Sequence, residues 1–325
     1  MEDILFQETS PVAELNQKLQ IIRAEIGKVI VGQQQVVDLL LTGLLCDGHL
    51  LLEGVPGVAK TLASKLLAHI IDVNFSRLQF TPDLMPGDVI GTAVFNPKEG
   101  NFYFKAGPIF SNIVLIDEIN RAPAKTQSAL FEVMEERQVT VDGFTHKMEY
   151  PFLVLATQNP IEQEGTYRLP EAQLDRFLFK IEIGYPTLEE EITILTQQQG
   201  KTQQELLQHA HKIISAQEIA GYRALVQQIN IDAKLIAYIA TIVNETRNNA
   251  ALYLGASTRA SLALLKAAKA TAALNGRDFV IPEDVQAMAP HVLRHRIMLT
   301  PEKEMEGVAP DQLIDSILKS IEVPR

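Results

Sequence analysis

The sequence contains no tryptophan and a single cysteine, Cys46, among its 325 residues. One cysteine excludes a disulfide within the chain, and its place in an apolar helical run indicates a small buried side chain. No apolar stretch approaches the roughly 20 residues that a membrane-spanning helix needs. The first residues, Met1–Ile4, are acidic where a secretory signal would be basic. We therefore expect a soluble, cytoplasmic protein without a membrane span.

Basic residues are also in deficit, because 29 Lys and Arg against 40 Asp and Glu give a formal net charge of -11. This sign opposes general nucleic-acid binding, since phosphate backbones attract positively charged surfaces. Hydrophobic residues make up 46% of the chain, which is enough for a large buried core. The length suggests two domains or one large domain.

A glycine-rich stretch from Glu53 to Thr61 is the most informative part of the sequence. An apolar run leads into it and a helical pattern follows, as expected for a strand, a turn and a helix start. Glycines let the backbone turn so that several N–H groups point at one phosphate, and the helix N-terminus adds positive potential. Lys60 would reach the β- and γ-phosphates, and the Thr61 hydroxyl would bind Mg²⁺. The predicted phosphate site consists of Gly54, Pro56, Gly57, Val58, Ala59, Lys60, Thr61 and Leu62.

One position departs from the usual phosphate-loop pattern, because Ala59 stands where the last glycine is normally found. We expect right-handed backbone angles at this residue, since it lies at the entry of the helix. Alanine would then cost little and would favour the helix. The substitution therefore leaves the prediction of a phosphate loop unchanged.

Two carboxylates end the next strongly apolar stretch. Residues 113–116 are all apolar, which is typical of a strand buried on both faces of a parallel sheet, and Asp117 and Glu118 follow them. Ligand sites of such sheets lie at this carboxyl end. Asp117 would hold the Mg²⁺ shell together with Thr61, and Glu118 would activate the attacking water. The acid pair alone is weak evidence, but after a phosphate loop it predicts nucleotide hydrolysis.

Two further positions are candidates for nucleotide contact. The apolar turn at Val31–Gly32 would either cover the adenine ring or simply belong to the core, and the sequence leaves both interpretations open. A buried strand over 152–157 leads to Asn159, whose amide would bind the γ-phosphate or the attacking water. By itself, Asn159 before a proline is more typical of a plain turn.

The rest of the chain predicts two hairpins and a change from α/β to helical structure. Two hairpins are expected, within 92–104 and within 139–145, the second with an Asp-Gly turn. After Pro186 only helical patterns are found. We therefore predict an α/β nucleotide-binding unit over 1–186 and an all-helical unit over 187–325.

Several segments, in order, resemble the MoxR type of AAA+ ATPases. Four of these segments precede residue 178: residues 54–61, 116–123, 156–160 and 169–177. Gly255–Ala260 and Val292–Arg296 extend the resemblance, which covers nearly the whole chain after about Ile21. Arg168 is a departure, since the family has a proline at this position.

The resemblance implies an α/β fold: an AAA+ P-loop NTPase core with a five-stranded parallel sheet in the order 5-1-4-3-2, inserted β-hairpins and an all-α lid. It also implies a homo-oligomeric ring, typically a hexamer, that binds ATP and Mg²⁺. Asn159 would be a sensor beside the γ-phosphate, and Arg259 a sensor carried by the lid. Arg176 would be an arginine finger acting on the neighbouring subunit's ATP. The alternatives are a structural ion pair of Arg176 with Asp175 and a helix-start ion pair of Arg259. The expected nucleotide contacts are the phosphate site, Val31, Gly32, Asp117 and Arg259.

The biological role implied by the resemblance is that of a chaperone or remodeller that helps activate, assemble or mature client proteins. A von Willebrand factor A-type partner often works with such ATPases. The alternative is a nucleic-acid-translocating motor, since helicase relatives share the inserted hairpins, but the net charge and the few basic residues of the hairpins oppose it. A scaffold that binds ATP without hydrolysing it is opposed by the presence of Lys60, Asp117, Glu118 and Arg176.

Overall fold

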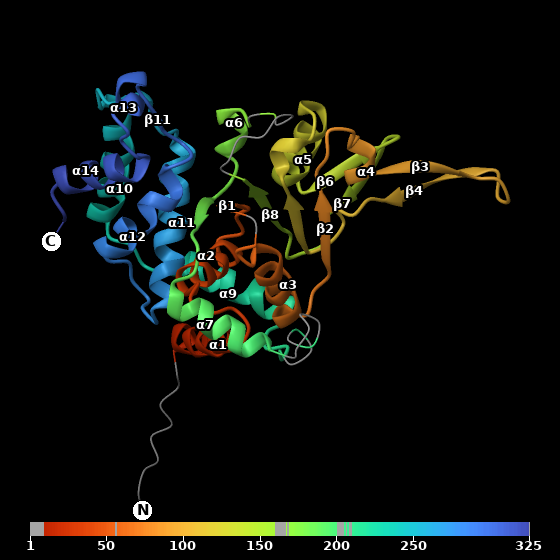
Figure 1. Cartoon of the computed structure of the whole chain (residues 1–325), viewed down its shortest axis with the longest axis horizontal. Helices are drawn as coiled ribbons and strands as arrows, with labels where there is room; N and C mark the ends of the chain where they lie inside the picture. Colours follow the sequence, from red (N-terminus) through yellow and green to blue (C-terminus); the bar gives the residue numbers. More distant parts are fainter. Residues whose placement is uncertain are drawn as a thin grey trace, which may run out of the picture.

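A sheet of five parallel strands forms the centre of the computed structural model, which describes residues 10–55, 57–159, 167, 169–199, 205, 207 and 210–324. The spatial order of the strands is β2-β5-β8-β1-β9 (Figure 1). In that order they are Phe75–Gln79, Ile113–Asp117, Leu153–Gln158, Leu50–Gly54 and Phe179–Ile183. If these five strands alone are numbered 1 to 5 along the chain, their order across the sheet, starting from β9, is 5-1-4-3-2. The predicted sheet is therefore confirmed.

The burial of each strand follows from its place in the sheet. All five residues of β5 are buried, as are the first five of β8, because both faces of these inner strands are covered. The strand β2 lies at the edge, and only Leu78 in it is buried. Arg77 and Gln79 are exposed along this edge strand, where they lie beside the carboxyl end of β5.

Helices and two hairpins surround the sheet (Figure 1). The helices of this part are α1 (Pro11–Gly27), α2 (Gln34–Leu45), α3 (Lys60–Ile71), α4 (Pro86–Ile90), α5 (Ala124–Glu136) and α6 (Glu171–Leu174), with a 3-10 turn, η1, at Ile119–Arg121. The hairpins are β3 (Gly91–Asn96) with β4 (Asn101–Ala106) and β6 (Gln138–Val141) with β7 (Phe144–Lys147). Both predicted hairpins are confirmed, and β3–β4 projects at the end of the molecule opposite the C-terminal helices.

In its described residues, the C-terminal part is helical apart from one small antiparallel pair and an isolated bridge between Asn230 and Phe279. Its helices are α7 (Leu188–Gln198), α9 (Ala216–Gln228), α10 (Ala233–Asn248), α11 (Thr258–Leu274), α12 (Pro282–Leu293), α13 (Pro301–Met305) and α14 (Pro310–Ser320). The pair consists of β10 (Leu252–Leu254) and β11 (Met298–Leu299). Ser215 and Glu218 form a reciprocal capping box at the start of α9, which fixes where this helix begins. The predicted all-helical lid is confirmed, with a minor strand pair added.

Alternate residues of the strands pack into two separate hydrophobic clusters. Ile113 and Leu115 join the cluster that contains α1, α2 and α3, whereas Val114 and Ile116 join the one that contains α5. The first cluster continues into α9, α10, α11 and α12. The helical part therefore shares a core with the N-terminal helices, and the boundary at 186 stays a prediction. Within the described ranges, no helix is both long and apolar enough to cross a bilayer.

His49 is buried at the amino end of β1 and links three elements. Its Nε2 lies 3.0 Å from the Met134 carbonyl oxygen, and the Val154 N–H donates to Nδ1 over 3.0 Å. These two bonds require the neutral ring, with the proton on Nε2. Burial lowers the pKa of His49 to about 3, and it lowers that of His291 to about 4. Burial also holds the pKa of His295 well below its ordinary value.

We predict that the protein loses stability as the pH falls below about 6.5. An unfolded histidine takes up a proton near pH 6.5, whereas these three stay neutral in the fold until much lower pH. The unfolded state then binds more protons, so each histidine removes up to about 1.4 kcal/mol of unfolding free energy per pH unit. Urea unfolding midpoints should fall between pH 7.5 and 5.5, with proton uptake on unfolding at the lower pH. Equal midpoints without proton uptake would contradict the neutral, buried histidines.

Candidate functional site

The glycine-rich turn joins β1 to α3, and its backbone differs from the expectation at one residue. Gly57 has a φ of 91°, and Ala59 has φ 59° and ψ 18°. The prediction of right-handed angles at Ala59 was therefore wrong. Ala59 is the residue before the first helical turn, where the chain reverses into the helix and needs the left-handed region that glycine adopts most easily. Alanine here costs about 1 kcal/mol or more instead of favouring the helix.

The start of α3 fits a bound phosphate. Ala59 has no side-chain oxygen and makes no side-chain cap, so the first N–H groups of the helix are left for another acceptor. This helix has 12 residues and begins at Lys60, so its dipole adds positive potential at that point. Thr61 follows in the first turn and is half-buried, while Leu62 is buried in the core. Pro56 lies outside the described residues.

The Lys60 ammonium lies inside this turn and faces acidic groups. Its Nζ donates to the Gly54 carbonyl oxygen over 2.6 Å, which folds the side chain back along the loop. Partial burial lowers the pKa of Lys60, and the negative charges of Asp117, Glu118 and Glu53 oppose that shift. The structure therefore brings the loop lysine within electrostatic range of both predicted carboxylates.

Asp117 ends β5 and is buried between two partners from the neighbouring strands. The Thr157 hydroxyl of β8 donates to Asp117 Oδ1 over 3.2 Å, and Arg77 Nε of β2 donates to Oδ2 over 2.6 Å. The same Thr157 hydroxyl accepts the Glu118 N–H over 3.0 Å. A carboxylate and a helix-start hydroxyl are ligands that Mg²⁺ accepts alongside phosphate oxygens and water. Asp117 and Thr61 are groups of this chemistry, and their binding of Mg²⁺ stays a prediction.

Glu118 leaves the strand in a left-handed conformation, with φ 57° and ψ 54°. Gln79 Nε2 of β2 donates to its Oε2 over 2.9 Å, and Arg121 NH1 lies 3.2 Å from the same oxygen. The carboxylate is therefore held aside by groups from the strand edge and the following turn. The role of Glu118 as a general base, which requires its carboxylate to reach the attacking water, stays a prediction.

The sequence reasoning missed Arg77, Gln79 and Thr157, which hold the acid pair in place. Part of this arrangement could have been read from the sequence, because Gln79 is the last residue of its strand. In the fold, the register of the sheet pairs Gln79 with Asp117. Polar residues at the ends of neighbouring parallel strands meet at one edge of the sheet. Finding them required the strand order, because β2 and β8 are far apart in the chain and flank β5 only in the fold.

The other predicted nucleotide contacts lie around this edge. Gln33 Nε2 donates to the Val58 carbonyl oxygen over 3.1 Å, so the Val31–Gly32 turn is tied to the phosphate loop. Gly32 has a φ of 76°, and a Cβ there would collide with the Glu190 carboxylate at the start of α7. Asn159 follows the end of β8, the strand between β5 and β1. Its sensor role, like the adenine contact at Val31–Gly32, stays a prediction.

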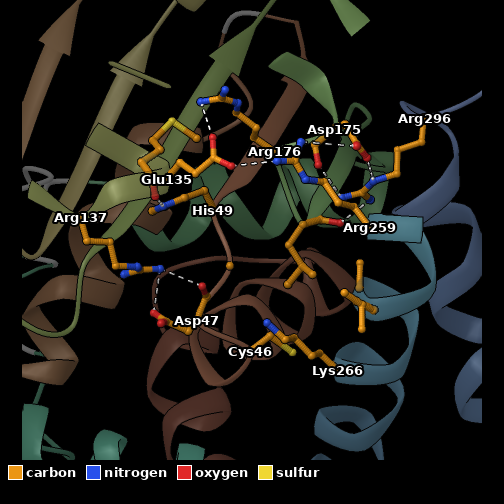
Figure 2. A pocket seen from close by; sticks show the side chains of 15 residues that line it. Cys46, Asp47, His49, Glu135, Arg137, Asp175, Arg176, Arg259, Lys266 and Arg296 are labelled. Atoms are coloured by element: carbon orange, nitrogen blue, oxygen red, sulfur yellow. Dashed lines mark hydrogen bonds and ion pairs between the residues drawn. The ribbon is translucent and has the colours of Figure 1, made fainter. Parts of the chain in front are cut away.

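Two predicted residues, Arg176 and Arg259, lie together at a different place (Figure 2). Arg176 NH1 donates to the Phe131 carbonyl oxygen over 2.8 Å and lies 2.9 Å from Glu135 Oε2. Arg259 NH2 donates to Glu135 Oε1 over 2.8 Å, and its NH1 lies 3.9 Å from Asp175. Both arginines line a cavity of 290 Å³ together with Lys266 and Arg296.

This arginine cluster lies at the amino edge of the sheet. Arg176 precedes β9, and residues 46–49, which also line the cavity, precede β1. The phosphate loop follows the carboxyl end of β1, and all strands of the sheet run in parallel. A five-residue strand spans roughly 16 Å, so the two sites of one chain are about that far apart. Asp175 is paired chiefly with Arg296, whose Nε lies 2.8 Å from its Oδ1.

Comparisons with known proteins agree with these features. Residues 49–179 match the family model of the ATPases associated with various cellular activities (AAA), and residues 244–317 match the AAA lid domain. YeaC, an uncharacterised protein of Bacillus subtilis, is 48% identical over 92% of each chain. The chaperone MoxR1 of Mycobacterium tuberculosis is 46% identical over 93% of this chain and 81% of its own.

A solved structure shows the same architecture throughout. The crystal structure of a Cytophaga hutchinsonii protein, described as a candidate ATPase, superposes with a TM-score of 0.89. It is 44% identical and covers 97% of each chain. The phosphate loop, the acid pair at the end of β5, the sheet order and these relatives lead to one conclusion: the chain belongs to the MoxR family of AAA+ ATPases.

Proposed function

We propose that this protein hydrolyses ATP to ADP and phosphate in a ring of identical subunits and uses the reaction to remodel client proteins. The observation that carries the proposal is that the loop with Lys60 and the acid pair Asp117–Glu118 follow parallel strands that end at the same edge of the sheet. Lys60 and the N–H groups of the loop would bind the phosphates, and Thr61 and Asp117 would hold Mg²⁺. The bound ion would offset phosphate charge, and Glu118 would accept a proton from water.

The separation of the two sites in one chain supports the proposed assembly. Charge that develops on the γ-phosphoryl oxygens needs cations close by, but Arg176 and Arg259 lie at the opposite edge of the sheet. A head-to-tail arrangement would place the arginine cluster of one subunit against the phosphate loop of the next. Such contacts close into a ring when the rotation between neighbours allows it, and a hexamer is the number we propose.

A role as a chaperone is supported by the relative of that name and by the hairpins. Phe102 of β4 is 71% exposed and Phe144 of β7 is 72% exposed, so both hairpins present aromatic side chains to solvent. Exposed aromatic groups are suited to contact with protein surfaces. We propose that the hairpins bind clients in the cytoplasm, with a von Willebrand factor A-type protein as a partner. The hairpins do not favour a nucleic-acid motor, because their few basic residues are accompanied by acidic ones: Lys98, Lys105, His146 and Lys147 beside Glu99, Asp142 and Glu149.

We predict that Lys60→Ala weakens ATP binding by about 100-fold or more, because charge-assisted bonds to phosphate contribute roughly 3 kcal/mol. Isothermal titration with ATP and Mg²⁺ measures this loss. Lys65→Ala is the matched control, since Lys65 is an exposed lysine of the same helix and should leave the affinity unchanged. Tight binding by Lys60→Ala would refute the phosphate loop.

We predict that Arg176→Ala binds ATP normally but hydrolyses it about 10³-fold more slowly or worse, as expected for an arginine finger. Its ATP site is intact, so Lys60→Ala subunits, which still carry Arg176, should restore hydrolysis when the two variants are mixed. Steady-state phosphate release reports the rate. The mass of the assemblies must show that they contain both variants. If such mixed assemblies do not regain ATP hydrolysis, Arg176 does not act on a neighbouring subunit.

A further inference from the structure

The Glu135 carboxylate lies between two guanidinium groups. Its Oε2 is 2.9 Å from Arg176 NH1, and its Oε1 is 2.8 Å from Arg259 NH2 (Figure 2). One carboxylate therefore holds both arginines of the cluster, with one oxygen for each. A shared counterion reduces the repulsion between two like charges and fixes the distance between them.

Glu135 joins two different parts of the molecule through these contacts. Arg176 follows α6 in the α/β part, whereas Arg259 lies in the first turn of α11 in the helical lid. Glu135 itself is near the end of α5. Glu135, which belongs neither to α6 nor to α11, therefore helps to set the position of Arg259 relative to Arg176. Asp175 adds a second link, since it accepts from the Ser257 hydroxyl at the start of α11 over 2.9 Å.

The local preference of the helix end does not account for an acidic residue at this position. The last turn of α5 contains Glu135 and Glu136 and no basic residue, although a helix C-terminus favours positive charge. The ion pairs are partly exposed, with 40% of the Glu135 side chain and 52% of the Arg259 side chain accessible. Pairs of this kind contribute little to stability because water screens them. A residue placed against local preference is a candidate for a functional role.

We propose that Glu135 is a positioning residue for hydrolysis, which holds Arg176 and Arg259 as one unit aimed at the ATP of the neighbouring subunit. The inference rests on the function proposed above. Each guanidinium has five N–H donors, so the contacts with Glu135 leave donors for phosphate oxygens. Groups already oriented before the reaction stabilise developing charge without a cost of reorganisation at that moment. Glu135 acts through the two arginines and not on the nucleotide itself.

The variant that tests this is Glu135→Gln, which keeps the size of the side chain and removes its charge. A neutral amide cannot accept from both arginines with two oxygens, so we expect kcat to fall about 10-fold. The KM for ATP and the mass of the assembly should stay unchanged, because the phosphate loop is at the opposite edge. Glu136→Gln is the matched control: it makes the same charge change in the same helix turn, and the ion pairs found with Arg176 and Arg259 in the described part of the chain are made by Glu135 and Asp175.

A double-mutant cycle with Arg259→Ala separates positioning from an independent effect. If Glu135 acts by holding Arg259 beside Arg176, then Glu135→Gln should slow Arg259→Ala by much less than it slows the wild-type protein. If the double variant instead lost kcat by the product of the two single-variant factors, the two residues would act independently and the proposal would be overturned. A Glu135→Gln protein that hydrolyses ATP as fast as the Glu136→Gln control would also overturn it.

The arginine variants show which of the two proposals has failed. If Arg176→Ala and Arg259→Ala both hydrolyse ATP at the wild-type rate, the function assigned to the cluster is wrong, and the role of Glu135 falls with it. If both are slow while Glu135→Gln is unaffected, the cluster acts as proposed and only the positioning role of Glu135 is overturned. A rise in KM with kcat unchanged would also overturn it, since that result indicates an effect on nucleotide binding.

Discussion

The parallel direction of the five strands is the constraint on which the rest of this structure depends. It gathers the phosphate loop, Asp117 and Glu118 at the carboxyl edge, because β1 and β5 both end there. The same direction places Arg176, just before β9, at the amino edge. One chain therefore carries the predicted nucleotide site and the arginine cluster at opposite edges of its sheet. In our account, hydrolysis requires two neighbouring copies, and the chemistry is coupled to assembly by geometry.

Much of the fold and of the nucleotide site could be predicted from the sequence. The phosphate loop, the acid pair and the hairpins have local signals, since each depends on a few consecutive residues. The resemblance to MoxR-type ATPases supplied the strand order, which no local pattern contains. The left-handed Ala59 was missed because the residue type favours a helix, whereas the turn geometry decides the backbone angles.

Contacts between distant segments could not be predicted from one sequence. Gln79 and Thr157 flank the acid pair only after β2, β5 and β8 are side by side. Glu135 is one of several acidic residues near the end of α5, and nothing local distinguishes it from Glu136. Its partner Arg259 is 124 residues away in the chain, so the link between core and lid became visible only in the fold.

The contacts between core and lid are of two kinds. Apolar side chains of α9 and α11 pack with α1 and α2 in one continuous cluster, which gives a stable attachment. Around Arg259 the contacts are ionic and partly exposed, and they are individually weak. The apolar packing therefore attaches the lid to the core, while the ionic contacts at its edge orient Arg259 beside Arg176.

The most direct test of this account is the specific ATPase activity measured against protein concentration, with the mass of the assembly determined at each point. If the arginine cluster acts on a neighbour, activity per subunit should be low where single chains dominate and should rise with the fraction assembled. Single chains that hydrolyse ATP as fast as the assembled protein would contradict the central claim, because their own arginines lie at the wrong edge of the sheet.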